Sequence, residues 1–164
     1  MSALNFRQHE AWGELLLRWW QGLDDDRGGR AALRRAPDIT AVVMLPVYQH
    51  LHRRLVAAGW PDSAWRNDRL AATAGLLAHV KRHANGTLPK SMSEGDKPRV
   101  SPLRFIRLLE APDIDTLFAG LRRTLPLLDH QADVLALATD VINWDDSVKK
   151  RWAYAYDWPQ KARD

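Results

Sequence analysis

The chain has 164 residues, of which 46% are hydrophobic, and it carries a formal net charge of +4 at pH 7. This length and composition predict a globular protein of one domain or two small ones and argue against disorder. The absence of cysteine excludes disulfides, zinc–thiolate sites, iron–sulfur clusters and cysteine nucleophiles. The first residues contain no signal-peptide core, and no apolar stretch reaches the roughly 18 residues of a membrane span. We therefore expect a cytoplasmic protein without a membrane partner.

Helical periodicity dominates the first half of the chain. Apolar residues recur at three- and four-residue spacings, which is typical of amphipathic helices. Asp38 is expected to cap one helix, Pro46 to occupy the first turn of the next, and Pro61-Asp62-Ser63 to open a third. The predicted helices cover residues 4–20, 29–36, 39–45, 46–59 and 61–85.

The second half begins with a segment that lacks helical periodicity. Glycine, proline and serine interrupt the periodicity over residues 85–101 and predict a long loop. Ser101 and Pro102 then restart the helical pattern as N-cap and first helical residue, Asp113 is expected to cap another helix, and Pro126 interrupts it. The predicted helices cover residues 102–109, 114–125, 127–144 and 145–158.

These patterns together predict an all-α protein of two small helical bundles. The N-terminal lobe would cover residues 1–84, the linking loop 85–101 and the C-terminal lobe 102–164. Eight tryptophans are many for this length, and most lie on apolar helical faces. We expect Trp158 and Tyr154, near the C-terminus, to be free to form an interface. The tryptophans expected in the core are Trp12, Trp19, Trp65, Trp144 and Trp152.

Signals for catalysis are weak. His79 and His83 have a spacing that a metal site could use, but Lys81 and Arg82 lie between them and no nearby carboxylate completes a ligand set. Partly exposed histidines at a helix end explain the pair better. Asp24-Asp25-Asp26 is typical of a solvated loop or cap. Glycine-rich phosphate loops, nucleophile elbows and HExxH motifs are missing. We therefore predict a protein that is not an enzyme and has no cofactor or metal.

Arginine outnumbers lysine 18 to 6, and the planar guanidinium suits bidentate contacts to phosphate. A GC-rich genome would produce the same bias, so the placement of the charges matters more. Each cluster alone is typical of a solvated face, and Asp24-Asp25-Asp26 could neutralise Arg30, Arg34 and Arg35 locally. Together the clusters suggest a phosphate track that positions a strand without reading its sequence. The candidate nucleic-acid-binding residues are Arg30, Arg34, Arg35, Lys81, Arg82, Arg99, Arg104, Arg107, Arg122 and Arg123.

Three of these arginines are expected to form one patch. The core-forming side of the helix over 102–109 should leave Arg104 pointing outwards, and the short Ala111-Pro112 link should fold the next helix back beside it. Arg122 and Arg123 would then lie next to Arg104. We expect all three to be exposed, and Arg34 and Arg35 would continue the patch if the two lobes are aligned.

The order of the motifs resembles the CasB family, the small subunit of the type I-E CRISPR surveillance complex Cascade. The likeness covers nearly the whole chain. No single motif is diagnostic, but their order and the total length are together fairly specific. The segments that carry it include Gly29-Arg30-Ala31-Ala32-Leu33-Arg34-Arg35-Ala36, Ala58-Gly59-Trp60, His79-Val80-Lys81-Arg82-His83, Arg104-Phe105-Ile106-Arg107-Leu108-Leu109, Leu121-Arg122-Arg123 and Arg151-Trp152-Ala153-Tyr154-Ala155-Tyr156.

The resemblance implies a non-catalytic, all-helical protein of two bundles. Two copies would pack head to tail in the complex, beside the repeated backbone subunits and the large subunit. They would stabilise the hybrid of guide RNA (crRNA) and target DNA and the displaced DNA strand, together called the R-loop. The positions that match the family's basic motifs are Arg34, Arg35, Lys81, Arg99, Arg104, Arg122 and Arg123.

Another class of function stays open. A helical protein–protein adaptor could use the same basic faces to dock acidic partners. A helix-turn-helix regulator is disfavoured, because no short helix pair carries an exposed face of base-reading side chains. DNA binding across a salt series distinguishes the nucleic-acid-binding subunit from the adaptor. Phosphate contacts predict a steep loss of affinity with salt and little sequence preference.

Overall fold

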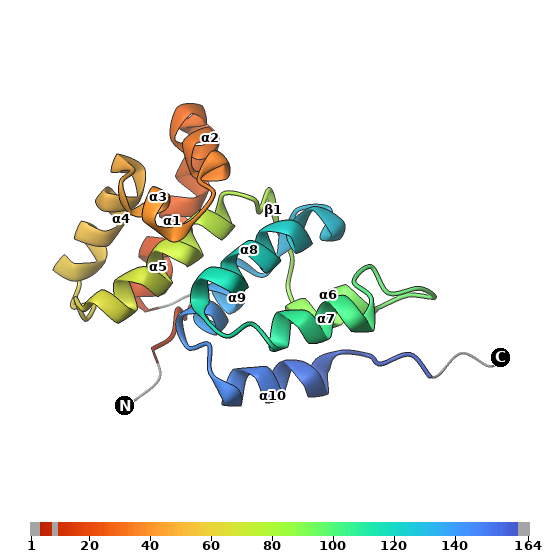
Figure 1. Ribbon diagram of the computed structural model, residues 1–164. Helices are drawn as coiled ribbons and strands as arrows, with labels where there is room; N and C mark the ends of the chain where they lie inside the picture. Colours follow the sequence, from red (N-terminus) through yellow and green to blue (C-terminus); the bar gives the residue numbers. More distant parts are fainter. Residues whose placement is uncertain (1–3, 8–9, 161–164) are drawn as a thin grey trace.

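The computed structural model describes residues 4–7 and 10–160 and folds them into ten α-helices, two short 3₁₀ helices and two strands (Figure 1). This confirms the prediction of an all-α protein. The strands β1 (Arg82–His83) and β2 (Gln131–Ala132) pair in parallel, and the 3₁₀ helices are η1 (Leu23–Asp25) and η2 (Leu125–Leu128). The α-helices are α1 (Ala11–Gly22), α2 (Arg27–Arg35), α3 (Ile39–Val43), α4 (Pro46–Ala57), α5 (Ala64–Leu77), α6 (Leu88–Ser93), α7 (Pro102–Leu109), α8 (Ile114–Thr124), α9 (Val134–Ile142) and α10 (Asp146–Ala155).

Side-chain caps fix the starts of most of these helices. In each case a serine or aspartate oxygen accepts a hydrogen bond from the backbone N–H three residues further on, which satisfies one of the free donors at a helix N-terminus. Pro46 and Pro102 occupy first helical positions. These contacts confirm the starts predicted for α3, α4, α5, α7, α8 and α10. The capping residues at five of them are Asp38, Ser63, Ser101, Asp113 and Asp145.

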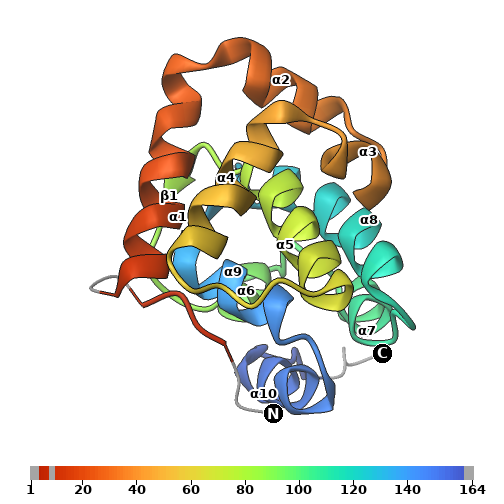
Figure 2. The ribbon, with the colours of Figure 1, turned by 90° about the vertical axis from the view of Figure 1, so that its left-hand side faces the viewer.

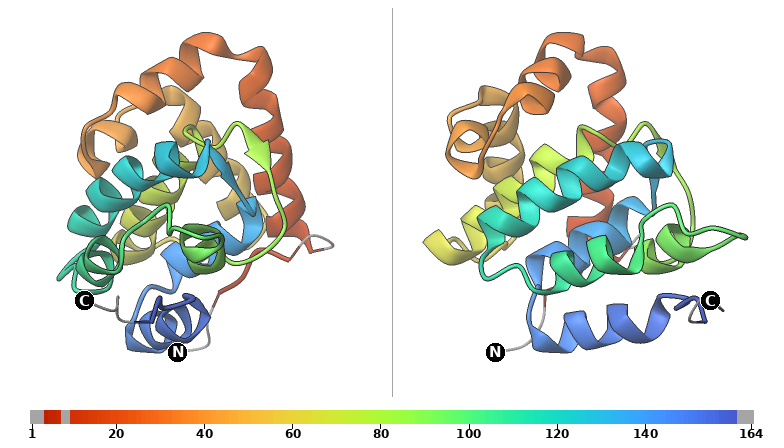
Figure 3. Two further views of the ribbon diagram at one scale, coloured as in Figure 1. Left: turned by 90° about the vertical axis from the view of Figure 1, so that its right-hand side faces the viewer. Right: turned by 45° about the vertical axis from the view of Figure 1, so that its right-hand side comes forward.

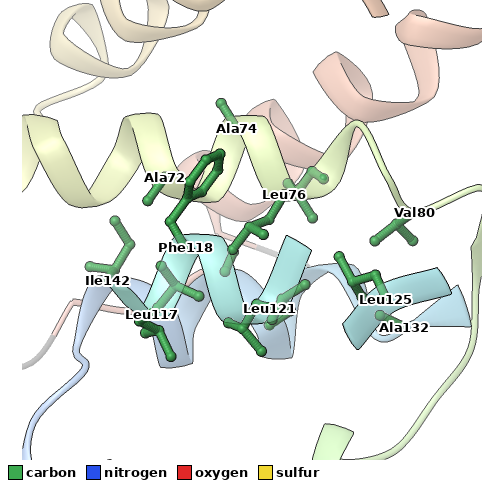
Figure 4. Close-up of a cluster of buried hydrophobic side chains, with 14 of the residues drawn as sticks. Ala72, Ala74, Leu76, Val80, Leu117, Phe118, Leu121, Leu125, Ala132 and Ile142 are labelled. Atoms are coloured by element: carbon green, nitrogen blue, oxygen red, sulfur yellow. The ribbon is translucent and has the colours of Figure 1, made fainter. Parts of the chain in front are cut away.

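Helix α5 forms the centre of the core. Every residue from Leu70 to Val80 is buried. Helices α3, α4, α8 and α9 all contact α5, and Figure 2 shows α4 and α8 on opposite sides of it. Figure 4 shows Phe118 and Leu121 of α8 packed against Leu76 of α5. Gly75 allows this crossing, because a Cβ atom there would lie 2.8 Å from Cε1 of Phe118.

The first predicted helix begins later than expected. Residues 4–7 lie outside any helix, and α1 starts only at Ala11. The backbone N–H of Leu4 donates to Oδ1 of Asn143, and that of Phe6 donates to Oγ1 of Thr139. The Phe6 ring also stacks on Trp60, with ring centroids 5.2 Å apart. Side chains of α9 thus satisfy donors that a helix would have used, and residues 8–9 lie outside the described residues.

The predicted loop over residues 85–101 contains a helix. Leu88 and Met92 of α6 are both buried, because their four-residue spacing places them on one face. Val100 is also buried, and its N–H donates to the Met92 carbonyl. In Figure 3 the green α6 and α7 lie above the blue α10, and the buried side chains before and after this segment form one continuous cluster. The division into two lobes stays a prediction.

The predicted helix over 127–144 is also shorter. Asp129 and His130 adopt φ values of 57° and 58°, in the left-handed region that a right-handed helix cannot include. The chain then forms β2, and α9 begins at Val134 after its cap, Asp133. The last helix ends at Ala155 rather than at residue 158.

Among the described residues, no helix has the length and apolar character needed to cross a bilayer.

The tryptophans divide as predicted with one exception. Trp19, Trp144 and Trp152 are buried and Trp12 is partly buried. Trp65 was expected in the core, but 53% of its surface is exposed. The outer residues follow the prediction, since Tyr154 is 91% and Trp158 is 43% exposed.

Candidate nucleic-acid interface

A groove between α7 and α8 carries three of the predicted arginines. Arg104 and Arg107 lie one turn apart on α7, and Arg123 lies on α8. All three are exposed, and the groove between the helices has a volume of about 360 Å³. We call this feature the α7–α8 groove; its lining is Arg104, Arg107, Leu108, Thr116, Gly120, Arg123, Thr124 and Leu127.

Local sequence explains why the two helices lie side by side. The caps Ser101 and Asp113 start them, and only a short segment around Ala111 and Pro112 separates them. Phe105 and Leu108 anchor α7 in the core. Gly120 lets Leu108 approach α8 closely, because a Cβ atom at Gly120 would lie 2.6 Å from Cδ2 of Leu108. The arginines thus project from a rigid pair of helices.

The charge of the groove is uniformly positive. Its lining includes three arginines and no aspartate or glutamate. Each guanidinium offers several N–H donors in a planar fork, which matches the oxygens of a phosphate. The hydroxyl of Thr116 adds a polar group, and Leu127, which is 38% exposed, adds an apolar surface. This arrangement can bind a phosphate backbone and carries no base-reading amide side chain.

The expected patch of Arg104, Arg122 and Arg123 forms only in part. Thr116, Gly120 and Arg123 share one face of α8 at i, i+4 and i+7, whereas Arg122 points to the other side. Arg122 is half-buried, and its Nη2 donates to the carbonyl oxygen of Arg34, 2.8 Å away. Two adjacent residues of a helix lie about 100° apart, so both could not enter the groove. The expectation that Arg122 is fully exposed is wrong.

Arg30 is also held by contacts within the protein. Its Nε donates to the carbonyl of Ala78 at 3.2 Å and its Nη2 to that of Val80 at 2.8 Å. Its Nη1 pairs with Asp24 at 2.9 Å, as the sequence had suggested. These carbonyls follow α5, where backbone acceptors have no helical partner. Arg30 therefore joins α2 to the end of α5, and its role in nucleic-acid binding stays a prediction.

The remaining candidates lie on other parts of the surface. Arg34 is half-buried and Arg35 is exposed in the last turn of α2. Lys81 and Arg82 are exposed just before and at the start of β1, a few residues after α5. Arg99 is exposed and pairs with Asp129, with 3.3 Å between Nη1 and Oδ2. These residues stay predicted nucleic-acid contacts, and none of them lines the α7–α8 groove.

His79 lies at the centre of a second group of cations. It is 9% exposed, so the expectation of a partly exposed histidine is wrong. Burial, together with the charges of Arg122, Arg34, His130 and Arg30, lowers its pKa to about 4. His79 is therefore neutral at pH 7, and its carbonyl oxygen is 2.9 Å from Nδ1 of His130.

The structure separates the two histidines that the sequence places one turn apart. Helix α5 ends at Leu77, so His83 lies on β1 and not beside His79. Its Nδ1 accepts from the N–H of Val134, and its Nε2 lies 3.0 Å from Oδ1 of Asn85. Within residues 4–7 and 10–160, no group of three or more histidine, aspartate or glutamate side chains is arranged to hold a metal ion.

Sequence reasoning missed the other residues of the groove. Thr116, Gly120 and Leu127 carry no charge, so a search for basic clusters does not select them. The spacing of Thr116 and Gly120 ahead of Arg123 was a usable signal, because it places all three on one helical face. Their contribution depends on the pairing of α7 with α8, which the short link between the helices had already suggested.

Comparison with known proteins places the chain in a family. A model of the family described as CRISPR-associated protein Cse2 matches residues 29–156. No curated protein sequence matches the chain. One chain in a crystal structure of E. coli Cascade, bound to a PAM-containing double-stranded DNA target, has the same fold with a TM-score of 0.68. The two sequences are 22% identical, and the match covers 86% of this chain and 91% of that one. The chain described here belongs to the Cse2 family of CRISPR-associated proteins.

Proposed function

We propose that the chain is a non-catalytic small subunit of a type I-E CRISPR surveillance complex and that its α7–α8 groove binds nucleic-acid backbone. The observation that carries this proposal is the groove itself, which is lined by three exposed arginines and by no acidic side chain. Family membership and the fold shared with a chain of E. coli Cascade support the assembly. The other proposed partners are the backbone subunits, the large subunit, crRNA, target DNA and a second copy of the chain.

The physical role of such a subunit is to shift a balanced equilibrium. Opening a DNA duplex and pairing one strand with RNA exchanges one set of base pairs for another of similar stability. Contacts to backbone phosphates then favour the open form without reading any base. Arginines held on rigid helices supply such contacts with little ordering cost, and a nucleophile is not needed for this task.

The proposal is tested with the isolated protein and fluorescent DNA. We expect weak binding to single- and double-stranded DNA of any sequence. The affinity should fall steeply between 50 and 200 mM salt, because about three phosphate contacts already give a clear salt dependence over this interval. A scrambled sequence at equal salt is the control. Strong preference for one sequence, or affinity that does not change with salt, would contradict the proposal and favour a protein–protein adaptor.

A further inference from the structure

Helix α5 starts at the edge of the molecule (Figure 1), and an exposed tryptophan, Trp65, is its second residue. The Trp65 ring is 53% exposed and lies against Arg69, whose Cζ is 3.8 Å from the ring centroid. Arg69 is itself fixed, because its Nη1 donates to the carbonyls of Trp144 at 2.7 Å and Ile142 at 3.3 Å. The ring is therefore held on a rigid support with its outer part in solvent, as in the anchor residues of protein interfaces.

Four aspartates belong to this region: two flank Trp65 in the sequence, and two interact electrostatically with Arg69 or Asp68. Asp62 and Asp68 lie three residues before and after Trp65. Burial lowers the pKa of Arg69, and the nearby charge of Asp145 opposes this shift. Asp115 of α8 lies within electrostatic range of Asp68 of α5. Burial raises the pKa of Asp115, and the neighbouring charges, including that of Asp68, raise it further. We call Trp65, Asp62, Asp68, Asp115 and Asp145 the Trp65 patch.

Arg69, whose guanidinium lies on the ring, compensates part of the negative charge of the Trp65 patch. Asp62 lies 3.3 Å from Nε2 of His52. Across the described part of the chain, neither Asp68 nor Asp115 has a salt-bridge partner. Like charges held close together cost stability, and such a cost is common where a surface serves a partner.

The chemistry of the patch selects a basic protein surface as the partner. Its carboxylates repel nucleic-acid phosphates, and the described residues hold no group of three acidic or histidine side chains suited to a metal ion. A lysine or arginine of a partner fits both the ring and the carboxylates of the patch, because its stem packs on an aromatic ring while its charge pairs with a carboxylate. The densest basic surface of this chain, the α7–α8 groove, is already assigned to nucleic acid, which favours a different protein over a second copy.

We propose that the Trp65 patch docks a basic surface of another protein subunit of the same complex. This inference rests on the proposed function, since it takes the partner from that assembly. Trp65 is the apolar anchor, and Asp68 and Asp115 pair with lysine or arginine side chains of the partner. The patch thus binds protein through acidic residues, while the groove binds nucleic acid through basic ones.

The test uses the full-length chain and the complex assembled without it. The other protein subunits and the guide RNA of the complex are purified together, and the labelled wild-type chain or a variant is titrated into them. We expect Trp65→Ala to weaken binding about 30-fold, as for an interface hot spot. The double variant Asp68→Asn/Asp115→Asn should weaken it about tenfold, as for losing two paired charges. DNA binding by the isolated variants should equal that of the wild type.

Matched controls are Met44→Ala for an exposed large apolar side chain and Asp25→Asn/Asp96→Asn for exposed aspartates, and both should bind like the wild type. The double variant Asp68→Asn/Asp115→Asn removes the repulsion between these carboxylates, so it should melt no lower than the wild type. The test therefore stays valid even if Trp65→Ala unfolds. If the wild-type chain does not bind, the proposed function is wrong. If the wild type binds and the two patch variants bind equally well, only the docking proposal is wrong. Loss of self-association alone in sedimentation would make a second copy the occupant and overturn the proposal.

Discussion

Arg122 of α8 donates a hydrogen bond from Nη2 to the carbonyl oxygen of Arg34, 2.8 Å away in the last turn of α2. The two residues are 88 positions apart in the sequence. The contact satisfies a carbonyl at the end of α2, where the helix has no internal donor. One of the two adjacent arginines of α8 therefore joins helices, and the other, Arg123, lines the groove.

This difference predicts unequal effects on stability for two neighbouring substitutions. Arg122→Ala should lower the free energy of unfolding by about 1 kcal/mol and the Tm by about 2 to 4 °C, because a half-buried charged hydrogen bond is lost. Arg123→Ala should change the free energy of unfolding by less than about 0.5 kcal/mol, because its side chain is exposed. Thermal melting of both variants checks this, and equal melting of the two would contradict it.

Asp140 predicts a larger loss of stability. Its carboxylate is buried, accepts from Nε1 of Trp152 at 2.8 Å and pairs with Arg151. Asp140→Ala should lower the free energy of unfolding by about 2 to 3 kcal/mol, because the buried indole N–H loses its acceptor. Urea denaturation measures this change. The control is Asp146→Ala, at an exposed aspartate. A comparable loss of stability in that variant would show that Asp140 has no special role.

His79 predicts a pH dependence of stability. Its pKa is lowered to about 4 by burial and by the nearby cations. Below pH 6.5 the unfolded chain takes up a proton at this residue and the folded chain does not, so stability falls as the pH drops towards 4. The full effect is about 3 kcal/mol. Urea denaturation from pH 7 to pH 4 should show this slope, and His79→Gln should lack most of it. An unchanged slope in the variant would exclude His79 as the cause.

Two glycines predict changes of opposite sign. In Gly75→Ala the new Cβ would meet Phe118 at 2.8 Å and Val42 at 3.0 Å, so we expect a loss of about 1 to 3 kcal/mol from overpacking. Gly22, at the end of α1, has open space around it. Gly22→Ala should stabilise the protein by about 0.5 kcal/mol through helix propensity and chain entropy. Thermal melting distinguishes the two, and a stabilising Gly75→Ala would show that α5 and α8 can move apart.

Local signals were sufficient for most of the helices. Asp38, Ser101, Asp113 and Asp145 mark helix starts because each cap contacts the backbone only three residues away. The sequence failed where distant partners decide the structure. Residues 4–7 look helical by spacing, but their backbone donors bind α9 side chains more than 130 positions away.

The groove was predictable to a similar degree. Spacing places Arg104 and Arg107 on the outer side of α7, and a short link predicts the pairing with α8. The structural contacts of Arg30 and Arg122 were not foreseeable, since both bind carbonyls at the ends of other helices. Trp65 has the spacing of a core residue, but its helix begins at Ala64, at the outer edge of the core.

The most direct test compares two triple variants for binding to single-stranded DNA at several salt concentrations. Arg104→Ala/Arg107→Ala/Arg123→Ala removes the charge of the groove, and Arg18→Ala/Arg27→Ala/Arg53→Ala removes three exposed arginines elsewhere. Each phosphate contact on a single strand contributes about 0.7 to the slope of log affinity against log salt. We expect the groove variant to melt like the wild type, bind more weakly and lose about 2 units of this slope. If it folds normally and binds DNA with the affinity and slope of the control variant, the α7–α8 groove is not the nucleic-acid interface.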